Sequence, residues 1–181
     1  MGYEKKAMRG CGVAMLFLLL FWSPVALHAA WIGSTAPEFT LKDGGGRSVS
    51  LEQFRGRVVF INFWASWCGP CKKEFPALNA FINKYETSDA VVLAINIDKK
   101  RSHADKFLEE IPLRSPNMIV LFDPASRVVA AYKARAMPTS FVVDRDGRIR
   151  YLHFGFNKRD KAKWTSEVDS LLKAWLGKGK V

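Results

Sequence analysis

Unbroken apolar runs alternate along this chain with segments whose apolar residues recur every three to four positions. Residues 58–63 and 90–97 are almost wholly apolar, which is typical of strands that are buried on both faces. The segment between these runs carries apolar residues at helical spacing, at Cys71, Phe75, Leu78, Ile82 and Tyr85. We therefore predict a buried strand, a helix over residues 68–85 and a second buried strand.

Shorter apolar segments predict the remaining strands. Residues 39–41 and 48–49 flank a glycine-rich turn and indicate a hairpin. Residues 139–143 and 149–153 indicate a second hairpin across a short turn. Residues 118–122 predict one more short strand.

Three further segments predict helices. Ser102 and Asp105 resemble a capping box at the start of the first. Residues 128–133 predict a short helix, and the C-terminal segment predicts a long one with Trp164 and Val168 on its apolar stripe. Strands that alternate with helices in this order indicate a three-layer α/β fold with a mixed central sheet.

The strongest candidate for chemistry is Trp67-Cys68-Gly69-Pro70-Cys71, at the junction of a buried strand and the helix that follows. Two cysteines separated by two residues in this context are typical of a redox-active dithiol. Cys68 is expected over the helix N-terminus, where unsatisfied N–H groups and the helix dipole favour the thiolate that attacks disulfides. Cys71, one turn into the helix, is then placed to attack the mixed disulfide and release the reduced partner.

Two other interpretations of the cysteine pair have to be weighed. A zinc site needs two more ligands, but the third cysteine, Cys11, lies in the N-terminal apolar segment, and the histidines His28, His103 and His153 are not clustered in sequence. A purely structural disulfide at this spacing closes a very small loop and restrains the unfolded chain little. The redox interpretation is therefore preferred.

The first 30 residues predict export. Three basic residues precede an apolar stretch over residues 12–22, and the small residues Ala29 and Ala30 follow as a candidate cleavage region. The pattern fits a signal peptide, and residues 11–32 are also long enough for an uncleaved signal anchor. In both cases the domain expected over residues 31–181 lies outside the cytoplasm.

The chain of 181 residues has a formal net charge of +11, and no nucleic-acid-binding motif accompanies that charge. Its basic residues are spread widely, with a mild cluster at Lys158, Arg159, Lys161 and Lys163. A solvated surface is the simpler interpretation, and attraction to an anionic membrane or an acidic partner is the alternative. We expect no nucleic-acid partner and a membrane contact only through the N-terminal segment.

The residues around the cysteine pair carry a family resemblance. Residues 63–73 resemble the active site of thioredoxin-fold proteins, and further matching stretches lie at residues 36–39, 51–56, 58–76 and 137–144. Over residues 36–156 the chain is similar to the TlpA/ResA-like branch of the thioredoxin superfamily. The resemblance implies a thioredoxin-like fold with an N-terminal hairpin and a family-type insertion before a cis-proline at Pro138.

The resemblance also assigns roles around the dithiol. It implies that Cys68 attacks the partner's disulfide and that Cys71 resolves the mixed disulfide. It places the substrate-binding surface at Trp67, Gly69, Pro70, Met137 and Pro138. The cis bond would expose the backbone of Met137 for strand-like pairing with an extended substrate. Trp67 is expected either to shield the Cys68 sulfur or to be a simple core aromatic.

A carboxylate completes the expected catalytic set. Glu74 lies three residues past Cys71 on the same helical face and is a candidate acceptor for the proton that Cys71 must lose. Thioredoxins place a buried aspartate in the preceding strand, where this chain has Asn62, which cannot titrate. The resemblance therefore suggests that Glu74 takes over part of the task. The alternative is a solvated carboxylate, or one paired with Lys73 or Arg55.

These features together predict an exported thiol–disulfide oxidoreductase. Reduction is the expected direction because the Gly-Pro dipeptide matches that of thioredoxin, whose potential is about −270 mV, against about −120 mV for the oxidant DsbA. The expected substrates are particular protein disulfides in the periplasm, such as those of cytochrome c maturation or copper-site assembly. Electrons are expected from a membrane donor of the DsbD/CcdA type, with no cofactor beyond the Cys68–Cys71 disulfide and no metal.

Three alternative functions stay open. A general disulfide oxidase or isomerase belongs to the same class. A thiol peroxidase is disfavoured, because its reactive cysteine normally follows a threonine and needs an arginine partner, whereas Trp67 precedes Cys68 here. A copper-binding chaperone would hold Cu(I) through Cys68 and Cys71. It would lack the histidine or methionine ligands that usually complete such a site, although Met137 is adjacent.

Overall fold

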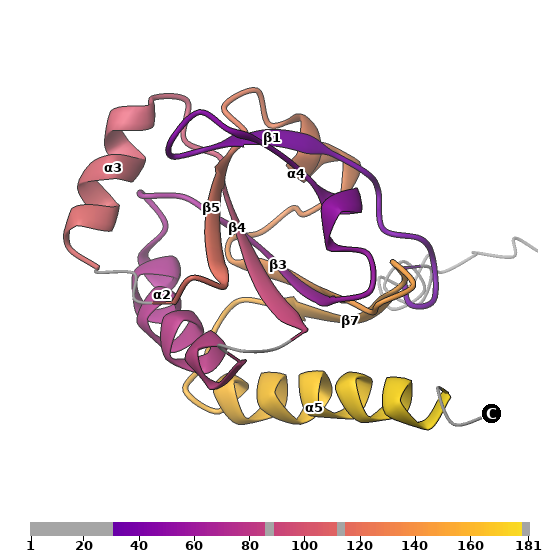
Figure 1. The fold of residues 1–181 in the computed structure, drawn as a ribbon. Helices are drawn as coiled ribbons and strands as arrows, with labels where there is room; N and C mark the ends of the chain where they lie inside the picture. The colour runs from indigo at the N-terminus through magenta and orange to yellow at the C-terminus, as the bar shows by residue number, and fades with distance from the viewer. Residues whose placement is uncertain (1–30, 86–88, 112–114, 179–181) are drawn as a thin grey trace, which may run out of the picture.

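A mixed β-sheet forms the centre of the fold (Figure 1). The computed structural model describes residues 31–85, 89–111 and 115–178, and within these residues the sheet has seven strands in the order β2-β1-β5-β4-β3-β6-β7. The strands are β1 (Thr40–Asp43), β2 (Ser48–Ser50), β3 (Val58–Trp64), β4 (Ala90–Asn96), β5 (Met118–Phe122), β6 (Thr139–Val143) and β7 (Ile149–Phe154).

Strand β3 organises the sheet around the cysteine pair. All its residues are buried, and it pairs in parallel with β4 and antiparallel with β6. Strand β4 also pairs in parallel with β5, and the two hairpins predicted from the sequence, β1–β2 and β6–β7, are antiparallel. The predicted α/β fold with a mixed sheet is therefore confirmed.

Helices cover both faces of this sheet. On one face α2 (Gly69–Ile82), α3 (Arg101–Glu109) and α5 (Asp160–Lys178) share an apolar cluster with the strands, and Trp164 is fully buried in it. On the other face the short helix α4 (Arg127–Ala131) and the 3₁₀ turn η1 (Leu51–Phe54) contribute to a second cluster. In this three-layer arrangement, α2 begins shortly after β3 ends.

Two helix boundaries differ from the prediction. The helix after the cysteine pair ends at Ile82 and is followed by a 3₁₀ turn, η2 (Asn83–Tyr85). The helix predicted over residues 128–133 is the five-residue α4. These differences lie at helix ends, where local periodicity says least about the last turn.

The predicted capping box at Ser102 is wrong. Helix α3 begins at Arg101, after an N-cap residue that makes no side-chain cap, so Ser102 is already inside the helix. Asp105 instead accepts a hydrogen bond from Arg101 Nε at 2.6 Å, and the Arg101 guanidinium lies 3.9 Å from the centroid of the Phe122 ring. The i,i+4 pair with Asp105 and the contact with β5 both fit a helix that begins at Arg101.

The predicted N-terminal signal or anchor, including Cys11 and His28, lies outside the described residues. Within the described ranges, no helix combines the length and the hydropathy that a membrane span requires. The described structure thus covers most of the domain expected over residues 31–181.

Candidate active site

The two cysteines occupy the start of α2. Cys68 is the N-cap residue of the helix, and Pro70, which has no N–H to leave unsatisfied, follows in the first turn. The cysteines form a disulfide with an S–S distance of 2.08 Å, and Cys68 Sγ accepts a hydrogen bond from the backbone N–H of Cys71 at 3.2 Å. In the reduced state the same N–H and the helix dipole favour a thiolate on Cys68.

The two sulfurs differ in their access to a partner. Cys68 is 4 % exposed and lines a surface groove, whereas Cys71 is 0 % exposed and lies behind it in the apolar cluster. An incoming protein therefore reaches Cys68 first. This asymmetry supports the roles expected from the sequence, with Cys68 as the attacking thiol and Cys71 as the resolving thiol.

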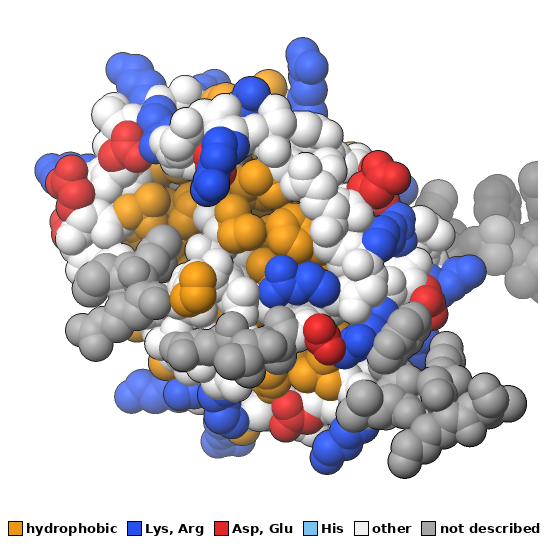
Figure 2. Space-filling view, in the orientation of Figure 1, with side chains coloured by type: hydrophobic (Ala, Val, Ile, Leu, Met, Phe, Trp, Pro, Cys, Tyr) orange, Lys and Arg blue, Asp and Glu red, His pale blue; other side chains and the backbone are white. Residues whose placement is uncertain are grey.

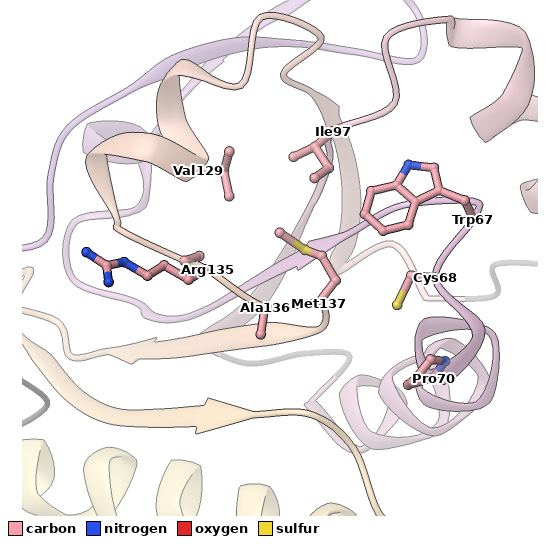
Figure 3. Close-up of a pocket in the computed structure, with 9 residues that line it drawn as sticks. Trp67, Cys68, Pro70, Ile97, Val129, Arg135, Ala136 and Met137 are labelled. Carbon is pink, nitrogen blue, oxygen red and sulfur yellow. The ribbon is translucent and has the colours of Figure 1, made fainter. Parts of the chain in front are cut away.

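The groove beside Cys68 is apolar and is built from four parts of the chain (Figure 3). It has a volume of about 440 Å³ and is lined by Trp67, Cys68, Pro70, Ile97, Val129, Ala134, Arg135, Ala136 and Met137. Trp67 is 68 % exposed, so the alternative of a core aromatic is wrong. The exposed indole beside the sulfur fits a contact surface for a partner, because large aromatic side chains contribute strongly to such contacts.

The loop before β6 closes the other side of this groove. The Met137–Pro138 peptide bond is cis, as the resemblance implied, and Met137 lies in the groove with Cys68. Figure 3 shows the Cys68 sulfur directed toward the loop that carries Met137. Gly69 is the first residue of α2, and a Cβ there would meet no atom within 4 Å, so crowding does not require glycine at this position.

Glu74 is buried in the helix face that packs on the sheet. The residue is 1 % exposed, and Glu74 Oε2 accepts a hydrogen bond from Asn62 Nδ2 at 2.9 Å. Burial raises the pKa of Glu74 to about 8; the Asn62 hydrogen bond opposes this rise and the negative charge of Asp160 adds to it. The alternative of a solvated carboxylate is therefore wrong, and Arg55 forms its ion pair with Glu38 instead.

Asn62 connects Glu74 to the strand that follows the cis-proline. Its Nδ2 also donates to Ser140 Oγ at 2.9 Å, because Asn62 and Ser140 are directly opposite in the β3–β6 ladder. Glu74 Oε1 has no hydrogen-bond partner among the described residues. A buried carboxylate with one unpaired oxygen, three residues from Cys71, is suited to accept a proton. Sequence reasoning missed Ser140, although a serine in a strand that is mostly apolar was a signal.

Asp98 anchors the loop that carries Trp67 and Cys68, and sequence reasoning missed this residue too. Its buried carboxylate accepts hydrogen bonds from Ser66 N at 2.9 Å, from Ser66 Oγ at 3.0 Å and from Asn96 Nδ2 at 2.8 Å. An acidic residue directly after a buried strand was the available signal. The three bonds hold the end of β4 against the residues that precede the reactive cysteine.

Asp98→Ala is expected to destabilise the fold by about 3 kcal/mol, because it removes three charge-assisted hydrogen bonds and leaves their donors buried or half-buried. Urea unfolding of the oxidised protein measures the loss. The matched control is Asp105→Ala, which breaks an exposed ion pair with Arg101 and should cost less than about 1 kcal/mol. Equal losses in the two variants would show that Asp98 does not anchor this loop.

No group of three or more His, Cys, Asp or Glu side chains that could hold a metal ion is found in residues 31–85, 89–111 and 115–178. The thioether of Met137 does line the groove with Cys68, as the copper hypothesis expected.

This chain is similar to several known proteins. The model of the Redoxin family matches residues 32–172. The thiol-disulfide oxidoreductase ResA of Geobacillus thermodenitrificans is 34% identical over 135 residues, which is 75% of this chain and 76% of the relative. The chain is thus similar to a curated oxidoreductase over most of both lengths.

Two solved structures are also similar. The provisionally assigned thiol:disulfide interchange protein DsbE from Chlorobium tepidum has a TM-score of 0.72 and 38% identity, over 78% of this chain and 97% of that one. The pneumococcal exposed lipoprotein thioredoxin Etrx1 from Streptococcus pneumoniae has a TM-score of 0.58 and 30% identity, over 71% of this chain and 97% of that one. The thioredoxin-like fold that the resemblance implied is therefore confirmed.

Proposed function

The chain belongs to the Redoxin family as a thiol–disulfide oxidoreductase of the ResA/DsbE type, and from that premise we propose that it reduces particular protein disulfides outside the cytoplasm. One observation carries the proposal. The helix-capping sulfur of Cys68 opens into an apolar groove while the Cys71 sulfur is buried behind it. This arrangement supports an ordered exchange with a protein partner that docks in the groove.

The exchange proceeds in two steps. The Cys68 thiolate attacks one sulfur of the partner's disulfide, a bond forms between the two proteins, and the partner's second sulfur leaves as a thiolate that takes up a proton. Cys71 then loses its proton and attacks Cys68 Sγ, and the partner's first sulfur leaves as a thiolate that takes up a second proton. The partner gains two electrons and two protons, and the protein is left with the Cys68–Cys71 disulfide. No cofactor beyond this disulfide enters the proposal.

Glu74 is the proposed proton acceptor for Cys71. Its pKa of about 8 lies close to that of an ordinary thiol, about 8.5, so proton transfer between the two groups has little free-energy cost. A carboxylate with the usual pKa near 4 would be a much weaker base for a thiol. The burial that raises the pKa of Glu74 is therefore useful for the resolving step.

The proposed role also requires a place where the protein acts and a source of electrons that reduces its disulfide again. The N-terminal charge and hydropathy pattern supports export, and the similar protein Etrx1 is itself described as an exposed lipoprotein. An exported reductant needs electrons that cross the membrane, so we propose a membrane donor of the DsbD/CcdA type. Cysteines of apocytochrome c or of a copper site are the proposed substrates, because these cysteines must be reduced before they bind haem or metal.

The dithiol is expected to have a reduction potential near that of thioredoxin, about −270 mV, rather than near the oxidant DsbA, about −120 mV. The reason is the Gly-Pro dipeptide between the cysteines, which thioredoxin shares. Equilibration with glutathione buffers, followed by mass spectrometry of the alkylated thiols, measures the potential. A value above about −180 mV, the range of the disulfide isomerase, would contradict the reductant role and favour an oxidase or isomerase.

A further inference from the structure

The segments that supply the groove beside Cys68 are rich in basic residues, whose exposed side chains are called the basic rim. Three segments supply both the groove residues and the surrounding surface, residues 66–73, 97–101 and 127–137. Six basic side chains in these segments are exposed and have no ion pair with any residue that the structure describes, at Lys72, Lys73, Lys99, Lys100, Arg127 and Arg135. Two more basic residues in the same segments, Arg101 and Lys133, already contact neighbouring side chains.

No acidic side chain on this rim balances that charge. Asp98 is the only acidic residue in the three segments, and it is buried with both carboxylate oxygens bonded to Ser66 and Asn96. Figure 2 shows one face of the molecule, where hydrophobic side chains gather at the centre and Lys and Arg side chains border them, with some Asp and Glu side chains among them. The segments that line the groove therefore combine an apolar groove with exposed basic side chains.

Arg135 is the only charged residue among those that line the groove. Figure 3 shows its side chain at the end of the groove away from Trp67 and Cys68, with the guanidinium directed outward. Because the guanidinium is not paired within the described residues, it is available for a carboxylate of the partner. The exposed indole of Trp67 at the other end offers an apolar contact.

We propose that the preferred disulfide partner presents an apolar side chain beside its reactive cysteine and acidic side chains a few residues away, which pair with Arg135 and the basic rim. The inference rests on the proposed function and adds to it the chemical class of the substrate. The apolar group fills the groove beside Trp67, and the acidic groups steer the encounter. Charge complementarity of this kind acts mainly on the association rate and is weakened by salt.

Three oxidised peptides test the proposal. They have the same length, one internal disulfide and a leucine before the first cysteine, and they differ only in flanking residues, which are aspartate, serine or lysine. The chemically reduced protein is mixed with each peptide, and the second-order rate constant of peptide reduction is measured. At about 0.01 M ionic strength the aspartate peptide is expected to react at least about tenfold faster than the lysine peptide. At about 0.5 M salt the ratio should fall toward one.

Charge-reversal variants test whether the peptide preference depends on Arg135 and Lys99. Arg135→Glu combined with Lys99→Glu should remove or reverse the preference for the aspartate peptide over the lysine peptide. Arg135→Gln should give an intermediate preference. The control is Lys84→Glu, a charge change of two units against four in the double variant, placed in η2 just past the C-terminal end of α2 and about 24 Å from Cys68 by helical rise. This control should keep the wild-type preference.

The outcomes separate the two proposals. If the three peptides are reduced at equal rates, or if the double variant and Lys84→Glu behave alike, the substrate preference is overturned and the reductant role stands. If no peptide is reduced, the proposed function fails, and the substrate preference fails with it. Equal peptide rates together with wild-type binding to phosphatidylserine vesicles, lost in the double variant, would assign the rim to a membrane surface and overturn the proposal.

Discussion

Replacing Cys71 with serine is expected to stop turnover and to leave the protein covalently joined to its partner through Cys68. The serine cannot attack the mixed disulfide, and the groove still presents the Cys68 sulfur to the partner. Multiple-turnover reduction should fall on the order of 10⁴-fold or more, the scale on which enzymes lose activity when a member of the reacting set is removed. The adduct is measured by non-reducing electrophoresis and mass spectrometry after expression in the native host.

Cys68→Ser is the matched control. It should abolish turnover and capture together, because the remaining thiol of Cys71 is fully buried. The captured proteins are expected to be extracytoplasmic proteins with paired cysteines. Capture through Cys71 in the Cys68→Ser variant would reverse the assigned roles, and capture of cytoplasmic proteins would contradict the proposed location.

Replacing Glu74 with glutamine is expected to lengthen the lifetime of the mixed disulfide by about 100-fold and to leave the first attack almost unchanged. Glutamine keeps the size and can still bond with Asn62, but it cannot accept a proton near neutral pH. The first attack depends on the helix N-terminus at Cys68, which the substitution does not touch. Stopped-flow reduction of a model disulfide protein separates the two phases.

The same substitution should change how stability depends on pH. The pKa of Glu74 is raised in the folded protein from 4.5 to about 8, so the neutral carboxyl is favoured by folding. Its contribution is fully present below about pH 4.5 and is lost as the pH rises through about 8, where the buried group ionises. The wild type should therefore lose stability over this range relative to Glu74→Gln, as measured by urea unfolding at a series of pH values.

Lys73→Gln provides the comparison for Glu74. Lys73 is the adjacent residue on α2 and is exposed, so its replacement should alter neither the lifetime of the mixed disulfide nor the pH profile of stability. If Glu74→Gln behaves like this control in both measurements, Glu74 has no role in proton transfer. The resolving step would then depend on solvent for the proton of Cys71.

Local periodicity was enough to determine the order and type of most elements. The apolar runs at β3 and β4 are longer than those of a strand with one exposed face, and the apolar residues after Cys68 recur at helical spacing. The sequence therefore places the cysteine pair at a strand–helix junction. Spacing also placed Glu74 on the same face of α2 as Cys71. The failure at Ser102 arose because a contact between Arg101 and Phe122 outweighed the local capping pattern.

The chemistry of Glu74 was decided by tertiary structure. A helical glutamate next to Lys73 is compatible with either solvent or burial, and only the packing of α2 against the sheet places it beside Asn62. The bond from Asn62 to Ser140 joins residues 78 positions apart, and it depends on the β3–β6 register. Sequence separation of this size leaves no periodic signal, because the pairing of strands is a property of the whole sheet.

The groove beside Cys68 and the basic residues around it were also decided by tertiary structure. Sequence analysis could list the basic residues and weigh an acidic partner against a solvated surface, but the groove joins the loops after β3 and after β4, helix α4 and the loop before β6. No local pattern in these four segments indicates that they form one groove. What the sequence by itself determined is therefore the dithiol, its place at a helix start and the helical position of the carboxylate. The family resemblance had already placed Met137 and Pro138 beside the dithiol, but only the fold brought Ile97, Val129 and Arg135 there, because β3 lies between β4 and β6 and distant loops meet at one edge of the sheet.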